Sequence, residues 1–234
     1  MEDRTVTAEQ WKTGREKVGL TQMEAAGALG VSQPYLSQLE KGLRASSFAL
    51  VRKAAKLYEL PTALPLKEPL ERSSVAPDEL QRKLASLGYP GFAHVRSRTA
   101  SNPAEVVLNA VVKRDLDTRL VEALPWVLAT YAGLNRKWLR DRAKLYNVQN
   151  RLGYLVHLAG QTARALPDRQ GAVPVLSRWE SELEEARLAN EGTLCRDSMP
   201  ASERAWLKTH RPEAAAHWNL LTGLTADQLP YAAH

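Results

Sequence analysis

The sequence predicts an all-α protein with a small N-terminal helical domain, a proline-rich linker and a larger C-terminal helical domain. Three observations support this fold class. Apolar residues recur every three or four positions through most of the 234 residues, as in amphipathic helices. Residues that cap helices precede many of these segments. Residues 61–78 contain four prolines and two serines without apolar periodicity, which is typical of linkers. We therefore expect domains at residues 1–65 and 78–234, with a linker at 66–77.

Capping residues predict the first two helices. Thr7 and Gln10 have the spacing of a capping box, so a helix should cover residues 8–18 and end at Gly19. Thr21 and Glu24 form a second box at the start of the next helix. Its apolar face should contain Met23, Ala26 and Leu29, and Gly30 should supply the turn that follows.

Two more helices complete the expected N-terminal domain. Ser32 caps the third helix, where Pro34 is tolerated because first-turn amides have no intrahelical partner. Leu36 and Leu39 should be its buried residues. A fourth helix, from about Phe48 to Tyr58, should end before Pro61, since the residue before a proline disfavours helix.

The C-terminal domain should be helical almost throughout. We expect helices at residues 78–87, 103–112, 116–132, 135–166, 175–190, 201–209 and 213–222, and one strand at about 92–98 after the turn at Gly88–Phe92. The segment 135–166 carries an apolar residue at every seventh position, which predicts one long buried stripe. These positions are Trp138, Leu145, Leu152, Ala159 and Leu166.

The third helix has the composition of a helix that reads DNA. A recognition helix lays its first turns in the major groove, where glutamine can pair bidentately with adenine and apolar atoms can touch thymine methyl groups. The candidate base-reading residues are Gln33, Pro34, Ser37 and Gln38. Free amides and the dipole at a helix N-terminus favour phosphate. The candidate phosphate contacts are Gln22, Ser32, Tyr35, Lys41 and Arg44.

On the motifs at Thr21–Gln22, Gly30, Ser32–Gln33 and Leu39–Gly42, residues 8–60 resemble the phage-repressor (Xre-type) family of helix-turn-helix domains. The resemblance implies a lambda-repressor-like domain of four to five helices that binds double-stranded DNA. It also implies a structural ion pair between Arg15 and Glu40. The chain departs from the family at Pro34, where a polar base-reading side chain is common. The alternative is that the same four-helix module serves only for protein docking.

Two patterns in the second domain suggest a partner. Lys137, Arg140, Lys144 and Arg151 would share one face of the long helix, as a solvated surface or as a contact for an acidic protein or nucleic acid. A thin apolar seam at Leu176, Trp179, Leu183 and Ala186 would either pack in the core or hold a partner helix. Trp11 should pack against the fourth helix. The other five tryptophans are expected to be anchors of the core or of an interface.

The sequence gives little support for catalysis or for a bound metal or cofactor. The five histidines lack metal-binding spacing, and no glycine-rich phosphate loop or GxSxG elbow is present. Cys195 is the only cysteine, so no intramolecular disulfide can form, and a reducing cytoplasm is the expected location. The sequence shows neither a signal peptide nor a transmembrane segment. The net charge of +6 favours polyanionic partners.

Residues 84–166, including LASLGYPGFAHV and LYNVQNRLGYLVHLA, resemble antitoxin regulators that accompany abortive-infection nucleotidyltransferase toxins. This resemblance implies a repressor that neutralises a toxin through its C-terminal domain and represses their shared promoter. Because one helix-turn-helix makes few base contacts, a homodimer on two half-sites about 34 Å apart is expected. The alternative is a one-component regulator whose helical domain senses a small molecule. Such a sensor needs a cavity of about 300 Å³ or more, whereas an antitoxin needs an exposed patch.

Overall fold

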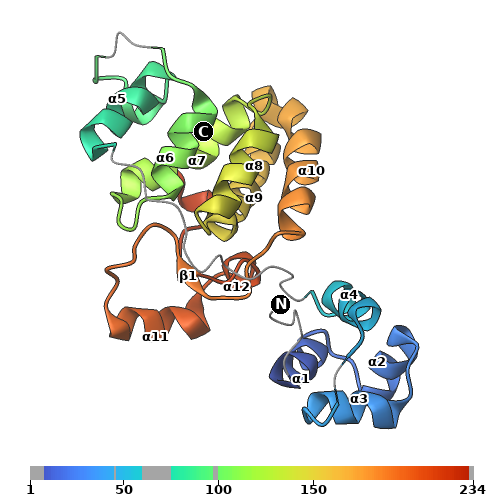
Figure 1. Ribbon diagram of the computed structural model, residues 1–234. Helices are drawn as coiled ribbons and strands as arrows, with labels where there is room; N and C mark the ends of the chain where they lie inside the picture. Colours follow the sequence, from blue (N-terminus) through green and yellow to red (C-terminus); the bar gives the residue numbers. More distant parts are fainter. Residues whose placement is uncertain (1–7, 45, 60–74, 97–99, 232–234) are drawn as a thin grey trace. The chain divides into compact units, whose positions relative to one another are not determined.

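The computed structural model describes residues 8–44, 46–59, 75–96 and 100–231 (Figure 1). The chain divides into two compact units, Met1–Thr62 and Ala63–His234. The all-α prediction is confirmed, because helices dominate both units and the described strands are two residues long. Most of the predicted linker lies outside the described residues, as does the Thr7 cap. None of the described helices is long and apolar enough to span a membrane.

The N-terminal unit contains the four predicted helices, α1 (Ala8–Lys17), α2 (Gln22–Leu29), α3 (Gln33–Glu40) and α4 (Phe48–Leu57). They close around one apolar core that includes Leu29, Leu36 and Leu39. Trp11 is 1% exposed, and its ring meets the edge of Tyr58, which follows α4, at a centroid distance of 6.1 Å. The prediction for Met23 is wrong, because its side chain is 76% exposed.

The C-terminal unit is built around α9 (Gln149–Ala165). Nearly all of α9 is buried, because α7 (Thr118–Thr130), α8 (Arg136–Leu145), α10 (Val173–Glu184) and α12 (Glu213–His217) pack against it. Figure 1 shows α8 and α10 beside α9. The remaining helical segments are α5 (Pro77–Ser86), η1 (Pro90–Phe92), α6 (Pro103–Val111), η2 (Pro167–Ala172), α11 (Ala201–His210) and η3 (Ala226–Gln228). Strands β1 (Gly192–Thr193) and β2 (Leu220–Leu221) pair in parallel.

The predicted strand at 92–98 is wrong for the residues that are described there. Pro90 starts the short 3-10 helix η1, and a turn follows it. The rings of Tyr89 and Phe92 both pack in the core, whereas the side chains of a strand would alternate between two faces of a sheet. Tyr89 contacts Phe92 and Trp126 edge-on, with centroids 5.3 and 5.5 Å apart.

The single helix predicted at 135–166 is also wrong, because the chain turns between α8 and α9. Asn147 has φ of +56°, a left-handed conformation that asparagine tolerates better than most residues. Val148 then donates a backbone hydrogen bond to the Ala143 carbonyl, which completes the turn. Leu145 is 38% exposed whereas Leu152 is buried, so the seven-residue repeat does not form one stripe.

Two predicted helices end earlier than expected. Helix α10 stops at Glu184, and the buried side chain of Asn150 then exchanges two hydrogen bonds with the backbone of Leu188. Helix α12 stops at His217, because Asn219 adopts φ of +53° and the chain continues into β2. Trp206 on α11 is 56% exposed and stacks on His210, so it is no core residue of this unit.

Candidate nucleic-acid interface

The turn between α2 and α3 is fixed by local hydrogen bonds. Thr21 and Glu24 form the predicted capping box, in which the Thr21 amide donates to the Glu24 carboxylate at 2.8 Å. Gly30 ends α2 with φ of +74°, which a residue with a Cβ rarely adopts. The Ser32 hydroxyl then accepts a hydrogen bond from the Tyr35 amide and caps α3. These caps set the direction in which α3 leaves the turn.

The predicted base-reading residues lie on the outer side of α3. Leu36 and Leu39 are buried against α1 and α2, whereas Gln33, Pro34 and Gln38 are exposed. Ser37 is half-buried. The side chains that could hydrogen-bond to base edges are therefore accessible to an approaching duplex.

The ion pair implied by the family resemblance is present at the C-terminal end of α3. The Arg15 guanidinium donates two hydrogen bonds to the Glu40 carboxylate, at 2.6 and 3.1 Å. Both side chains are largely buried, with 11% and 4% exposed. Burial alone would raise the pKa of Glu40, but the hydrogen bonds from Arg15 and Gln22 outweigh it and hold this pKa below its usual value. Glu40 is therefore charged at neutral pH and ties α3 to α1.

This ion pair extends to the candidate interface through two glutamines. The Gln22 amide donates to Glu40 at 2.8 Å, and the Gln33 amide donates to the Gln22 oxygen at 2.8 Å. An amide group has two hydrogens and one oxygen. Gln33 can therefore keep this bond and still present a donor and an acceptor to an adenine edge. Sequence spacing could not reveal this relay, because its members come from α1, α2 and α3.

The predicted phosphate contacts surround the same surface. Lys41 and Arg44 are exposed just after α3, while Gln22 and Tyr35 are partly buried. The Arg44 guanidinium lies over the Tyr35 ring, 5.1 Å from its centroid, and makes a long hydrogen bond of 3.5 Å to Gln38. Arg44 is thus held beside a candidate base-reading residue, which the sequence did not indicate.

The proposed partner-binding set is only partly at the surface. Lys137 and Lys144 are exposed on α8, and Arg140 on the same helix is half-buried and contacts Asp141 and Glu182. The prediction for Arg151 is wrong, because it belongs to α9 and is 6% exposed. Of the two alternatives for Trp179, packing in the core is the one that the structure shows, and binding of a partner helix is wrong. Its side chain is fully buried in the core, as are Leu176 and Leu183.

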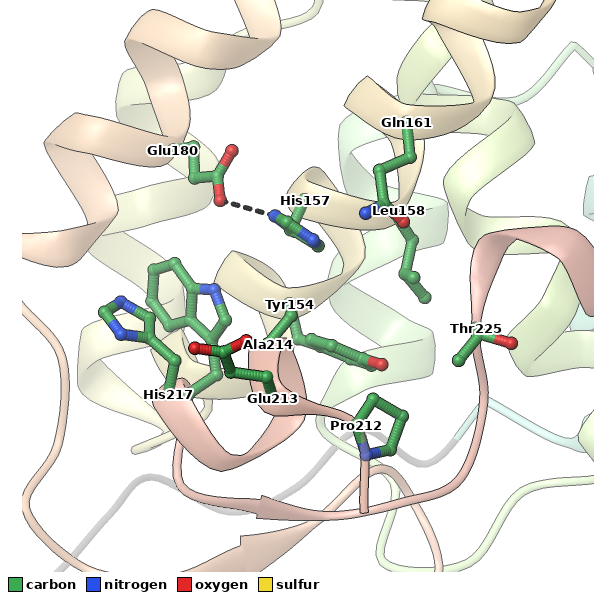
Figure 2. Close-up of a pocket in the computed structure, with 11 residues that line it drawn as sticks. Tyr154, His157, Leu158, Gln161, Glu180, Pro212, Glu213, Ala214, His217 and Thr225 are labelled. Atoms are coloured by element: carbon green, nitrogen blue, oxygen red, sulfur yellow. Dashed lines mark hydrogen bonds and ion pairs between the residues drawn. The ribbon is translucent and has the colours of Figure 1, made fainter. Parts of the chain in front are cut away.

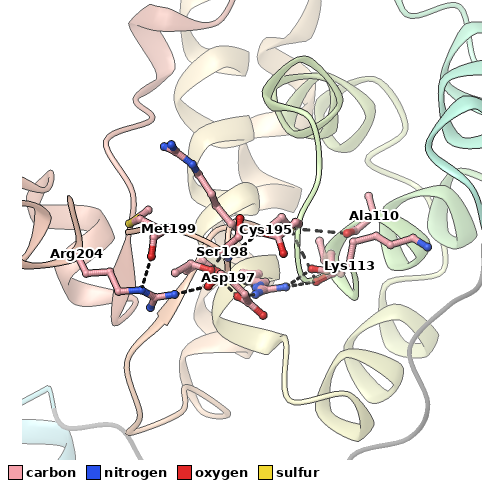
Figure 3. Close-up of polar contacts among 12 residues, drawn as sticks. Ala110, Lys113, Cys195, Asp197, Ser198, Met199 and Arg204 are labelled. Carbon is pink, nitrogen blue, oxygen red and sulfur yellow. Dashed lines mark hydrogen bonds and ion pairs between the residues drawn. The ribbon is translucent and has the colours of Figure 1, made fainter. Parts of the chain in front are cut away.

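Arg151 instead joins three segments of the C-terminal unit; two of its partners, Lys113 and Asp197, are labelled in Figure 3. Its guanidinium donates to the carbonyls of Val111, Lys113 and Thr193 at 3.0, 2.5 and 2.7 Å. It also pairs with Asp197 at 2.6 Å. A buried arginine is stable only with such a full set of acceptors. Arg151 is therefore a structural residue.

The C-terminal unit also contains an open cavity of about 500 Å³ between α9, α10 and α12, which we call the α9–α12 cavity (Figure 2). Its polar lining comprises His157, Gln161, Glu180, Glu213, His217 and Thr225. The sequence does not reveal this group, because its members are spread over 69 positions of the chain, from His157 to Thr225. Within the described part of the chain, no group of three His, Cys, Asp or Glu residues could hold a metal ion.

Comparison with known proteins identifies the N-terminal unit. Residues 9–65 match the family model described as a helix-turn-helix domain. Searches of curated proteins and of solved structures found no match. Residues 9–65 therefore form a helix-turn-helix domain, which is consistent with the resemblance to the Xre-type family.

Proposed function

We propose that this protein is a sequence-specific transcriptional repressor that reads its operator through α3. The observation that carries the proposal is the exposure of Gln33 and Gln38 on the outer side of α3, next to the basic residues Lys41 and Arg44. Glutamine side chains on a recognition helix can distinguish adenine from other bases, and the cations can neutralise phosphates on either side.

A homodimer follows from the small size of this reading surface. A single helix-turn-helix makes few base contacts, so useful affinity normally requires two half-sites about 34 Å apart on one face of the DNA. Two copies of the chain would supply the two recognition helices. We propose that the protein acts in the cytoplasm by binding, without catalysis of its own.

We further propose that the C-terminal unit binds a toxin encoded in the same operon. The resemblance of residues 84–166 to antitoxin regulators supports this role. The exposed cations of α8, Lys137 and Lys144 with the half-buried Arg140, would suit an acidic surface on the toxin. Arg151 and Trp179 play no part in this contact, since both are buried.

A promoter reporter in cells tests this division of labour. The full chain should repress its own promoter and protect cells against the product of the neighbouring gene. A chain that lacks residues 1–65 should lose repression and keep protection. The double variant Gln33→Ala/Gln38→Ala should behave like the truncated chain. A folded truncated chain that fails to protect would contradict the proposed roles.

A second candidate function is a one-component regulator that responds to a small molecule. The α9–α12 cavity favours it, because its volume of about 500 Å³ lies within the range of small-molecule sites. In that case repression in the reporter strain should change with the supply of a metabolite and not with the toxin gene.

A further inference from the structure

We propose that the α9–α12 cavity binds a small organic cation, an amine or guanidine attached to an apolar body. This inference is independent of the DNA-binding argument, because every residue of the cavity belongs to the C-terminal unit. Four features of the cavity support it: its charge, the arrangement of its carboxylates, its apolar wall and its packing.

The charge of the lining favours a cation. Two carboxylates, Glu180 and Glu213, line the cavity, and no lysine or arginine is among the described residues that do so. The carboxylate of Glu213 has no ion-pair or hydrogen-bond partner in the described parts of the chain. An anionic ligand would therefore meet like charges, whereas an ammonium group would gain charge-assisted hydrogen bonds.

The carboxylates approach the cavity from two sides. Figure 2 shows Glu180 on α10 above and Glu213, at the start of α12, below it, with His157 between them in height. The His157 Nδ1 atom lies 2.8 Å from the Glu180 carboxylate, which fixes the direction of both side chains. The Gln161 side chain adds an amide oxygen that can accept a hydrogen bond.

His217 completes this side of the cavity. Its Nε2 atom lies 2.7 Å from Glu184, a carboxylate that also contacts the buried Arg187 at 2.8 Å. The charge of Glu184 is therefore largely balanced by Arg187. Glu180 and Glu213 remain as the groups that can attract an added positive charge.

The other wall of the cavity is apolar and rigid. Tyr154 and Trp218 are each 1% exposed, and Leu158, Pro212 and Ala214 continue this wall. The Tyr154 hydroxyl donates to the Leu224 carbonyl, so this ring is fixed in place. Trp218 packs directly on Gly153, where any Cβ would lie 2.1 Å from the indole ring. A ligand with an apolar body could rest on this wall while its cationic group meets the carboxylates.

The test uses three probes of similar shape and different charge: phenethylamine, 2-phenylethanol and 3-phenylpropionate. Each is titrated into the full chain at neutral pH without DNA, by calorimetry and ligand-observed NMR. Phenethylamine should bind with a Kd on the order of millimolar, as expected for so small a ligand. The alcohol should bind at least about tenfold more weakly, and the acid should not bind.

Variants locate the binding to the cavity. Glu213→Gln, at an exposed position, should weaken phenethylamine binding about tenfold without affecting folding, and Glu180→Gln should do the same. Glu105→Gln is the matched control, since Glu105 is exposed on α6 and does not line the cavity. Binding should also shift the imidazole resonances of His157.

The proposal is overturned if phenethylamine fails to bind, if the three probes bind alike, or if Glu105→Gln weakens binding as much as Glu213→Gln. Operator binding, measured separately on the same samples, reports on α3 alone. Loss of operator binding would count against the proposed function and leave the cavity result unchanged.

Discussion

Removing the carboxylate of Glu40 should destabilise the helix-turn-helix domain far more than removing a neighbouring surface charge. In Glu40→Ala the Arg15 guanidinium, 11% exposed, loses two hydrogen bonds and its buried counter-ion, and the Gln22 amide loses its acceptor. Breaking one partner of a buried ion pair typically costs about 3–5 kcal/mol. A unit as small as Met1–Thr62 is typically stable by roughly 3–9 kcal/mol. The substitution should therefore remove much or all of its stability.

Amide hydrogen exchange measures this loss in the right part of the chain. Fluorescence would mix Trp11 with five tryptophans of the other unit, whereas exchange in α1, α2 and α3 reports their opening separately. The matched control is Glu16→Ala, because Glu16 contacts the same Arg15 at 3.6 Å but is 52% exposed. Glu16→Ala should lower the free energy of unfolding by no more than about 1 kcal/mol. Equal protection in the two variants would refute the assignment of Glu40 as a buried structural partner.

Three further predictions concern pH and packing. Because the pKa of Glu40 is lower in the folded unit than the value of about 4.5 in an unfolded chain, its ionisation stabilises the fold above pH 4.5 or so. This contribution is lost as the pH falls through the folded pKa. In Glu40→Gln the free energy of unfolding should therefore decrease less on acidification than in the unaltered chain. Arg151→Leu should destabilise the C-terminal unit by about 3–5 kcal/mol in urea unfolding, because it breaks the ion pair with Asp197 and removes the hydrogen bonds to three buried carbonyls. Gly153→Ala should cost at least about 1–3 kcal/mol in the same assay and disturb the α9–α12 cavity, since the new Cβ would overlap Trp218.

The two variants of the C-terminal unit each have a control in the same unit. Lys144→Met on exposed α8 should change stability by less than about 0.5 kcal/mol, and a similar loss for Arg151→Leu would contradict its structural role. Gly160→Ala lies on the same helix as Gly153, and its Cβ would meet only Arg164 at 3.9 Å. It should be neutral or stabilising by up to about 1 kcal/mol. If the loss of stability at low pH is the same in Glu40→Gln as in the unaltered chain, Glu40 does not cause that loss.

Local signals predicted the N-terminal unit well. Thr21, Gly30 and Ser32 determine the backbone within one helical turn of themselves, so their effect can be read from neighbouring residues. The exposure of Gln33 and Gln38 followed in the same way from the burial of Leu36 and Leu39. The pairing of Arg15 with Glu40 spans 25 positions, and only the family resemblance implied it.

The errors in the C-terminal unit arose where tertiary contacts override a repeat. The seven-residue pattern continued across Asn147, whose left-handed conformation ends one helix and separates Arg151 from Lys144. Arg151 was assigned to the surface because residue type alone does not show whether an arginine finds buried hydrogen-bond acceptors. For the same reason the sequence left two alternatives open for Trp179, of which the structure shows the core packing. The α9–α12 cavity depends on three helices and left no local signal.

The most direct test of the central claim compares binding to two duplexes at one salt concentration. The operator is first selected from a random duplex pool with the full chain, and a scrambled duplex of equal length is the second ligand. Gln33→Ala/Gln38→Ala should lose about 1–3 kcal/mol of operator binding for each bidentate contact removed and little on the scrambled duplex. Lys41→Ala should weaken both complexes alike. Equal losses on the two duplexes for the glutamine variant would contradict base reading by α3.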